Sequence, residues 1–407
     1  MFGRLTLLVF GLLLLQACSN PAPSPVSDAT ASEETPASTI LPSVPPDGSE
    51  QASDDPGENP QPAEPVPEIQ WQRAVVEGDA EYVGVAAFET GFVTVDRLGR
   101  VLVSGDGLIW EEIAAGQEAF ATEGWLEFNA LVTSGAQILL VGSEHAADGE
   151  EIDAAVWISP DGRSWERVVD DKSVFGGPGS QSFRAVTWTR DGFVAVGHDN
   201  PLDTEQGRLA IWVSPDGRDW KRLPHDPDSF EALEDLEGLS VAVGPGGSVV
   251  VGRRGADGAV WYSPDTQRWE LLTPMSEVFG GDNYQVVWDV LPVGEGFLAV
   301  GGTDPEAGAW VSVDGRSWRL IRDFGRGSIR SVTAMPGGFV GVGVENRSGV
   351  LRAAVWISPD GSSWYRIPHN EEIFGGAGNT LMYDVASSGN RVVAVGYGGI
   401  WVAQADE

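Results

Sequence analysis

Short runs of apolar residues alternate with turn residues from about residue 71 to the end of the chain, without a long helical period. In one unit the runs cover residues 183–188, 192–197, 209–213 and 220–223, and glycine, proline and polar residues separate them. Short strands that return in the same order of four are typical of the blades of a β-propeller. The second run of the unit recurs at residues 91–95, 137–142, 192–197, 248–252, 296–301, 338–343 and 391–396. The sequence therefore predicts an all-β fold, a seven-bladed β-propeller with four-stranded blades.

A polar motif, S-x-D-G-x-x-W, follows the third apolar run of every unit except the last. Its six copies lie 46 to 55 residues apart, and only Thr266 replaces the glycine. The aspartate can accept hydrogen bonds from turn N–H groups, and the glycine adopts backbone angles that other residues avoid. We therefore expect a rigid turn between the third and fourth strands, and not an active site. The structural aspartates are Asp106, Asp161, Asp216, Asp265, Asp314 and Asp360.

The two ends of the repeated region complement each other. The last unit stops after a third run at residues 400–402, with no motif and no fourth run. The letters WQRA at residues 71–74 resemble the segment that follows each motif, such as WERV at residues 165–168. We therefore expect residues 69–407 to form one propeller, in which the N-terminal strand completes the last blade and removes an open sheet edge.

The first residues of the chain have the pattern of an export signal. Arg4 precedes an apolar run at residues 5–15, which is too short to cross a bilayer and is typical of a signal peptide. The run ends in LQAC at residues 15–18, which resembles the bacterial lipobox, whose cysteine carries the lipid. We expect a lipoprotein signal peptide at residues 1–17, a lipid on Cys18 and an extracytoplasmic location at the bacterial cell membrane. An ordinary secretory signal cut near Ala17 is the alternative.

The composition of residues 18–68 predicts a disordered linker. They are rich in proline, serine, alanine and acidic residues, and they contain no lysine or arginine. Such a segment buries too little apolar surface to offset the entropy cost of ordering. Cys18 is the only cysteine, so no disulfide is expected within the chain. The linker would hold the propeller away from the membrane.

The charge of the chain restricts its partners. Sixty acidic and 25 basic residues give a formal net charge of −35, which disfavours nucleic acid and a polybasic contact with lipid. We expect a monomer that touches the membrane only through its lipid anchor. The four histidines lack metal-site spacing, so we expect no metal and no cofactor, although the long acidic loops at residues 143–153 and 198–208 leave Ca²⁺ binding open.

The repeated motif resembles the Asp-box, or bacterial neuraminidase repeat, in a form one residue shorter than the commonest one. Proteins with this box include sialidases, xyloglucan-cleaving enzymes, a photosystem II assembly group and sortilin-type receptors, so the resemblance implies a propeller over residues 71–407. It further implies, for a sialidase, six blades, a tyrosine nucleophile with a glutamate partner, an aspartate and three arginines. The letters YRIP at residues 365–368 resemble a sialidase motif, but they follow a repeated motif directly, which indicates a structural Arg366. The resemblance carries a fold and not a function.

Polar residues recur near the start of the first run in successive units, on the face expected to lie opposite the motifs. They are Asn129, Arg184, Ser240, Gln285, Arg330 and Tyr383. Side chains at equivalent places could surround a central pocket and hydrogen-bond a small polar ligand. The alternative is that they point between blades or hold water in the channel. Trp125, which lies before a first run, is a candidate surface platform.

The functional hypothesis is a non-catalytic binding or assembly scaffold for a protein or a glycan. A tethered ring with diverse loops on one face, and no acid–base pair visible in the sequence, favours this hypothesis. The rival is a glycoside hydrolase of the sialidase type or a related one. A Tyr–Glu pair beneath three converging arginines on the motif-free face would favour the rival.

Overall fold

The computed structural model describes residues 69–76, 80–89, 91–113, 118–149, 151–169, 171–201, 207–230, 235–272 and 276–405. The expected signal peptide, Cys18 and the linker lie outside these residues. Within the described part, no helix is both long enough and apolar enough to cross a membrane.

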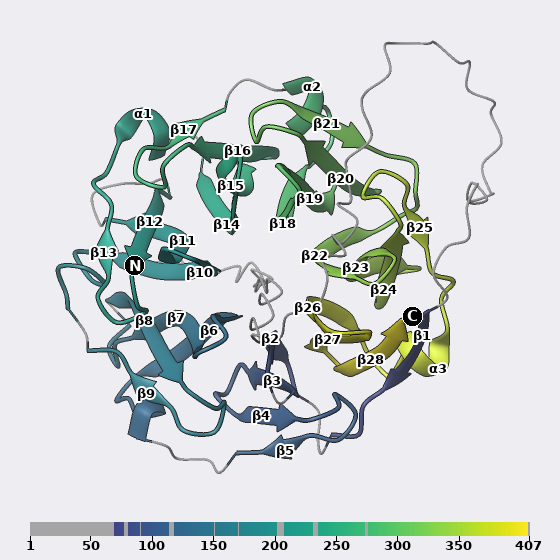
Figure 1. Cartoon of the computed structure of the whole chain (residues 1–407), viewed down its shortest axis with the longest axis horizontal. Helices are drawn as coiled ribbons and strands as arrows, with labels where there is room; N and C mark the ends of the chain where they lie inside the picture. The colour runs from purple at the N-terminus through teal and green to yellow at the C-terminus, as the bar shows by residue number, and fades with distance from the viewer. Residues whose placement is uncertain are drawn as a thin grey trace, which may run out of the picture.

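Antiparallel sheets stand around a central axis, as Figure 1 shows, and the described part of the chain is nearly all β. The first sheet contains β2 (Tyr82–Phe88), β3 (Gly91–Asp96), β4 (Val101–Ser104) and β5 (Glu111–Glu112). An eight-stranded sheet follows, with β6 (Trp125–Thr133), β7 (Ile138–His145), β8 (Ile152–Ser159), β9 (Glu166–Arg167), β10 (Ser180–Thr189), β11 (Gly192–Asn200), β12 (Leu209–Ser214) and β13 (Lys221–Arg222). Only one residue pair, Ser180 with Ile152, joins its two groups of four strands.

The remaining sheets have four strands each. They are β14 (Leu236–Gly244), β15 (Gly247–Arg254), β16 (Asp257–Ser263) and β17 (Glu270–Leu271); β18 (Val286–Val293), β19 (Gly296–Gly302), β20 (Ala307–Ser312) and β21 (Trp318–Ile321); β22 (Ser328–Met335), β23 (Gly338–Arg347), β24 (Val350–Ser358) and β25 (Tyr365–Arg366); and β26 (Leu381–Ser388), β27 (Arg391–Tyr397) and β28 (Gly399–Ala405) with β1 (Ile69–Arg73). Short helices lie between sheets: η1 (Glu118–Phe120), α1 (Pro227–Phe230), α2 (Ser276–Phe279) and α3 (Glu371–Phe374). The expected propeller architecture is confirmed.

The hydrophobic core lies between neighbouring sheets. One core cluster joins strands β6–β8 to β10–β12, and another joins β22–β24 to β26–β28. Every third strand except β4 places a tryptophan in this core, where it is less than 2 % exposed: Trp157, Trp212, Trp261, Trp310, Trp356 and Trp401. The repeated tryptophans are therefore structural.

The N-terminal strand completes the last sheet, as predicted. Strand β1 pairs antiparallel with β28, and Arg73 lies opposite Trp401. The two strands are adjacent at the rim of the ring in Figure 1. Because β1 comes from the start of the domain and β28 from its end, this pairing links the two ends of the ring.

The innermost strands are β2, β6, β10, β14, β18, β22 and β26, which we call first strands (Figure 1). Near its start, each of them has one residue that has no partner on the following strand, so the pairing register shifts by one. The residues skipped by these shifts are Val83, Asn129, Arg184, Leu239, Trp288, Arg330 and Tyr383. Shifts of this kind re-aim side chains next to binding sites and at the rims of barrels. The shifts all lie at the same end of the ring, where the first strands begin.

Candidate functional site

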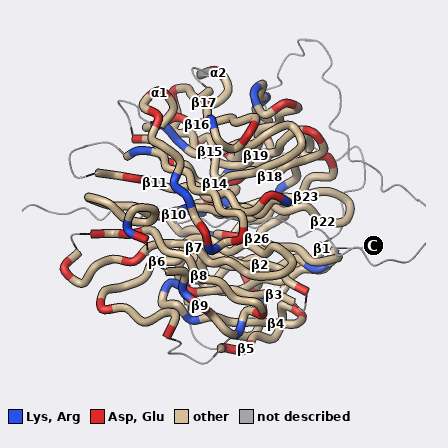
Figure 2. Tube along the Cα trace, turned by 60° about the vertical axis from the view of Figure 1, so that its left-hand side comes forward, with Lys and Arg blue, Asp and Glu red and all other residues tan. Residues whose placement is uncertain are grey.

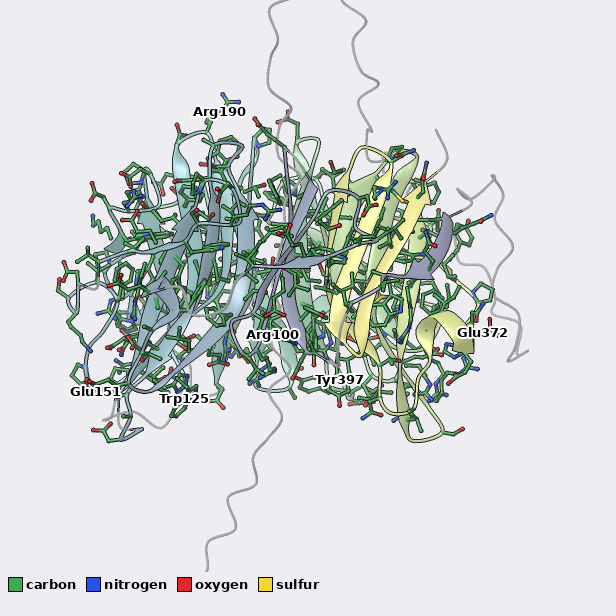
Figure 3. The ribbon with its side chains drawn as sticks, turned by 90° about the horizontal axis from the view of Figure 1, so that it is seen from below. Arg100, Trp125, Glu151, Arg190, Glu372 and Tyr397 are labelled. Atoms are coloured by element: carbon green, nitrogen blue, oxygen red, sulfur yellow. The ribbon has the colours of Figure 1, made fainter. Side chains whose placement is uncertain are left out.

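The ring has two chemically different ends. We call the end where the first strands begin the mouth; the repeated turns lie at the opposite end. Figure 3 shows Arg100, Trp125 and Tyr397 on the side of the mouth and Arg190 on the side of the turns. Acidic residues are spread over loops on several sides of the molecule, so the net negative charge is not confined to one face (Figure 2).

Hydrogen bonds occupy the aspartates of the repeated turns. Asp216 Oδ1 accepts hydrogen bonds from the backbone N–H groups of Asp219 and Arg218, each at 2.8 Å, and Ser214 Oγ accepts one from Gly217 N at 2.8 Å. These backbone bonds, that from Asp219 first, hold the pKa of Asp216 below its usual range. The same pair of backbone bonds forms at Asp106, Asp161, Asp265, Asp314 and Asp360. The carboxylates of these six turns thus hold the turns closed.

The structure brings four of the expected site residues to equivalent places at the mouth. Asn129, Arg184, Arg330 and Tyr383 are skipped residues of β6, β10, β22 and β26. Each of them is buried. Their equivalence follows from the register shift, which recurs in every sheet.

The prediction that Gln285 and Ser240 occupy the same position as these four residues is wrong. Trp288 holds the skipped position of β18, and Gln285 lies just before that strand, where its amide donates a hydrogen bond to Gly280 O. Ser240 follows the skipped Leu239 by one residue. The connections between sheets differ in length, so counting from the apparent strand start in the sequence misplaces both residues.

Residue pairs behind the skipped residues divide the mouth into two halves. The residue two positions before each skipped residue pairs with a residue at the end of the second strand, and we compare these pairs around the ring. In the polar half these pairs are Glu81 with Arg97, Glu127 with Ser143, Ser182 with His198, and Glu237 with Arg253. In the apolar half they are Val286 with Gly302, Ser328 with Val344, and Leu381 with Tyr397.

Cations in the polar half face carboxylates. The Arg184 guanidinium lies 3.8 Å from Glu127 Oε1 and 3.6 Å from Glu237 Oε1. Burial opposes the ionisation of Glu127, but its hydrogen bond with His145 and the charge of Arg184 keep its pKa lowered. Burial, with help from Arg184, lowers the pKa of His198 to about 3, so this imidazole is neutral. The charges in this half compensate one another.

The apolar half contains a cavity of about 590 Å³. Arg330 lies in its wall, 7 % exposed, with its Cζ atom 3.6 Å from the centre of a Trp288 ring. Trp288 Nε1 donates a 3.0 Å hydrogen bond to Ser328 Oγ, which fixes the indole. Burial lowers the pKa of Arg330 to about 10, a value at which the guanidinium is still charged at neutral pH. The cavity thus has one fixed cation against an aromatic wall.

A Tyr–Glu pair lies between the two halves. Tyr383 Oη donates a 2.7 Å hydrogen bond to Glu81 Oε1, and Glu81 Oε2 lies 2.8 Å from Arg97 Nε. Burial first, and the bond to Glu81 second, raise the pKa of Tyr383. Tyr383 is 2 % exposed, so its hydroxyl is poorly accessible. Glu81 was not a predicted site residue, because it comes from 302 residues earlier in the chain.

Deeper in the ring, two buried carboxylates connect the inner strands. Asp289 accepts hydrogen bonds from Ser240 Oγ at 2.8 Å and Ser331 Oγ at 3.2 Å, and Asp384 accepts from Ser331 Oγ at 2.9 Å and Val85 N at 2.8 Å. Burial, and in second place the charge of Asp289, raise the pKa of Asp384 well above its usual value. These bonds connect β14, β18, β22, β26 and β2, which indicates a structural network.

The structure holds no cluster of three or more metal-ligating side chains among the described residues. Glu150 and residues 202–206 of the two long acidic loops lie outside the described part. Calcium binding by these loops therefore stays a prediction.

No protein-family model and no curated protein matches the sequence. Solved structures match the fold. Virginiamycin B lyase from Staphylococcus aureus aligns over 83 % of this chain and 99 % of its own, with 8 % identity and a TM-score of 0.51. A catalytically inactive variant of that lyase with quinupristin aligns over the same shares with 7 % identity and a TM-score of 0.53. An α-L-arabinanase from Penicillium chrysogenum with arabinobiose covers 85 % of this chain and 99 % of its own, with 12 % identity and a TM-score of 0.44. At these identities the likeness extends to a propeller-type fold alone.

Proposed function

We propose that the chain is a lipid-anchored, extracytoplasmic binding protein that captures a ligand at its mouth without transforming it. The observation that carries this proposal is the composition of the cavity wall. Its lining contains one carboxylate, Asp304, and no histidine, cysteine or lysine. Hydrolysis of a glycosidic bond ordinarily uses a pair of carboxyl groups, and this wall supplies no such pair. A protein or a glycan is the proposed class of partner.

The finer architecture belongs to the same proposal. We regard the eight-stranded sheet as two blades, because a single residue pair joins its halves. The ring then has seven blades. We also regard the six turns as Asp-boxes, Cys18 as the lipid attachment site and the protein as a monomer.

A binding survey with two opposed variants tests the proposal. Full-length protein would be applied to arrays of glycans and secreted proteins. Asn346 is an exposed residue of the cavity lining, and Asn346→Trp would obstruct the opening. Arg190→Trp places the same bulk on an exposed hairpin at the opposite end. We expect binding that Asn346→Trp reduces at least tenfold and Arg190→Trp leaves unchanged. Equal loss in both variants would contradict a site at the mouth.

A glycoside hydrolase is the second candidate, because Tyr383 and Glu81 form the hydrogen-bonded pair that the sialidase resemblance implies. The arginines fit the three converging arginines of a sialidase less well. Arg97 pairs with Glu81, while Arg184 is held between Glu127 and Glu237. The proposal of binding without catalysis predicts no turnover of sialosides or aryl glycosides. Turnover that is lost in Tyr383→Phe would establish the hydrolase instead.

A further inference from the structure

We infer that the cavity between β18 and β22 binds a single carboxylate carried on an apolar, flat group, with Arg330 as its anchor. This inference rests on the proposed binding function and names the chemistry of the ligand.

Arg330 differs from the other buried arginines in having no carboxylate. Arg184 faces Glu127 and Glu237, and Arg366 Nη2 lies 3.2 Å from Glu345 Oε2. Among the described residues, by contrast, Arg330 Nε and Nη1 have no hydrogen-bond partner. A buried cation without a counter-ion is costly, because the interior replaces little of its hydration. An acceptor from a ligand would supply the missing partner.

The guanidinium is held ready for a planar acceptor. Trp288 stacks on it at 3.6 Å, and the Trp288 indole is itself fixed by Ser328. A planar guanidinium with fixed orientation donates two parallel hydrogen bonds to a carboxylate. Nε and Nη1 are themselves buried, so a ligand would reach the guanidinium from the cavity side, where Arg330 forms part of the wall.

The walls of the cavity select an apolar body. Val286, Val344, Leu351 and Trp288 line it, and Tyr284 lies at its rim, 44 % exposed. Glycine helps to open the space: Gly302 takes the place that arginine, serine or histidine occupies in the polar half. A Cβ added at Gly302 would approach Ser328 Oγ to 2.7 Å. The volume of about 590 Å³ is that of a small-molecule site.

The charges of the cavity lining and of the whole chain favour a ligand with one negative charge over a ligand with several. The lining carries Arg330 and Arg326 against Asp304, so it has one positive charge in excess. The chain as a whole carries −35 and repels multiply charged anions. A carboxylate satisfies both conditions better than a phosphate monoester does. The carboxylate can belong to a free aryl acid or to the C-terminus of a chain that ends in an aromatic residue.

The test uses the full-length chain with 2-naphthoate and 2-naphthamide, which differ only in the charged group. Binding is measured by titration calorimetry. A peptide that ends in phenylalanine, with its C-terminus free or amidated, forms the second arm. We expect 2-naphthoate to bind at least 30-fold more tightly than 2-naphthamide if the source is a free acid. We expect the free peptide to exceed the amidated peptide by the same factor if the source is a chain end.

Two variants assign the effect to Arg330. Arg330→Met keeps the side-chain volume but removes the charge, and we expect it to weaken the preferred carboxylate probe at least 30-fold. Arg190→Met removes an exposed cation from the hairpin at the opposite end of the ring, and we expect a change of less than threefold. The melting temperature of Arg330→Met without probe should not fall below that of the wild type, because a buried charge without a counter-ion is removed.

Several outcomes would overturn the inference. They are binding that does not distinguish acid from amide, equal loss in the two variants, a marked fall in the melting temperature of Arg330→Met, and no binding of either acid probe. Glycan or protein binding that depends on Asn346 but not on Arg330 would overturn this inference and leave the proposed function standing. Glycoside turnover would overturn the proposed function without affecting an Arg330-dependent carboxylate site.

Discussion

Trp71 fixes the strand that closes the ring, so Trp71→Ala measures how much this closure contributes to stability. The indole is 6 % exposed and makes an edge contact with Phe374 at 6.4 Å between ring centres. It lies in the core cluster that joins the last two sheets. Among the residues that the structure describes, its Nε1 atom has no hydrogen-bond partner, so the substitution removes packing and none of the described hydrogen bonds.

The expected loss follows from the size of the deleted group. Truncating a buried tryptophan to alanine costs about 3–5 kcal/mol, because apolar burial is lost and a cavity is left behind. The unfolding entropy of a domain of about 340 residues is roughly 0.7 kcal/mol per degree. The melting temperature should therefore fall by about 4–7 °C.

The measurement is thermal unfolding followed by calorimetry, together with urea denaturation. Trp125→Ala is the matched control, because Trp125 is 52 % exposed and stacks on His145, with 4.3 Å between ring centres. We expect the control to change the unfolding free energy by about 0.5 kcal/mol or less. Deleting residues 71–76 should lower the melting temperature further than Trp71→Ala does. If Trp71→Ala and the deletion both melt like the wild type, β1 does not hold the ring closed.

Two further predictions concern a buried carboxyl and a strained turn. The folded-state pKa of Asp384 is raised above the unfolded value of about 3.9. The contribution of Asp384 to the free energy of unfolding should therefore decrease as pH rises from about 4 through the raised pKa. Relative to wild type, Asp384→Asn should become more stable by up to about 1.4 kcal/mol per pH unit in that window, and parallel urea-denaturation curves at all pH values would contradict this. Thr266 has φ 58° where the neighbouring turn has Gly217 at φ 80°, so Thr266→Gly should raise the free energy of unfolding by about 1 kcal/mol. The reverse change, Gly217→Thr, should lower it, and a loss of stability in Thr266→Gly would refute the strain argument.

The sequence by itself determined the repeated architecture, because its signals are local. The carboxylate of Asp216 accepts hydrogen bonds from residues two and three positions ahead, and both donors lie within the motif. The third-strand tryptophans repeat with the sheets that bury them. The absence of a fourth strand at the C-terminus, together with a matching segment at Trp71, was enough to predict the pairing of β1 with β28.

Only the tertiary structure decided the chemistry of the mouth, because its contacts join distant segments. Tyr383 meets Glu81 across 302 residues, and no local pattern marks that pair. The skipped register puts Trp288 where Gln285 was expected, since the offset depends on the length of each connection between sheets. Whether a buried arginine is compensated also depends on which sheets are neighbours. Arg184 and Arg330 occupy equivalent positions, yet the sheets around Arg184 supply glutamates and those around Arg330 supply a cavity.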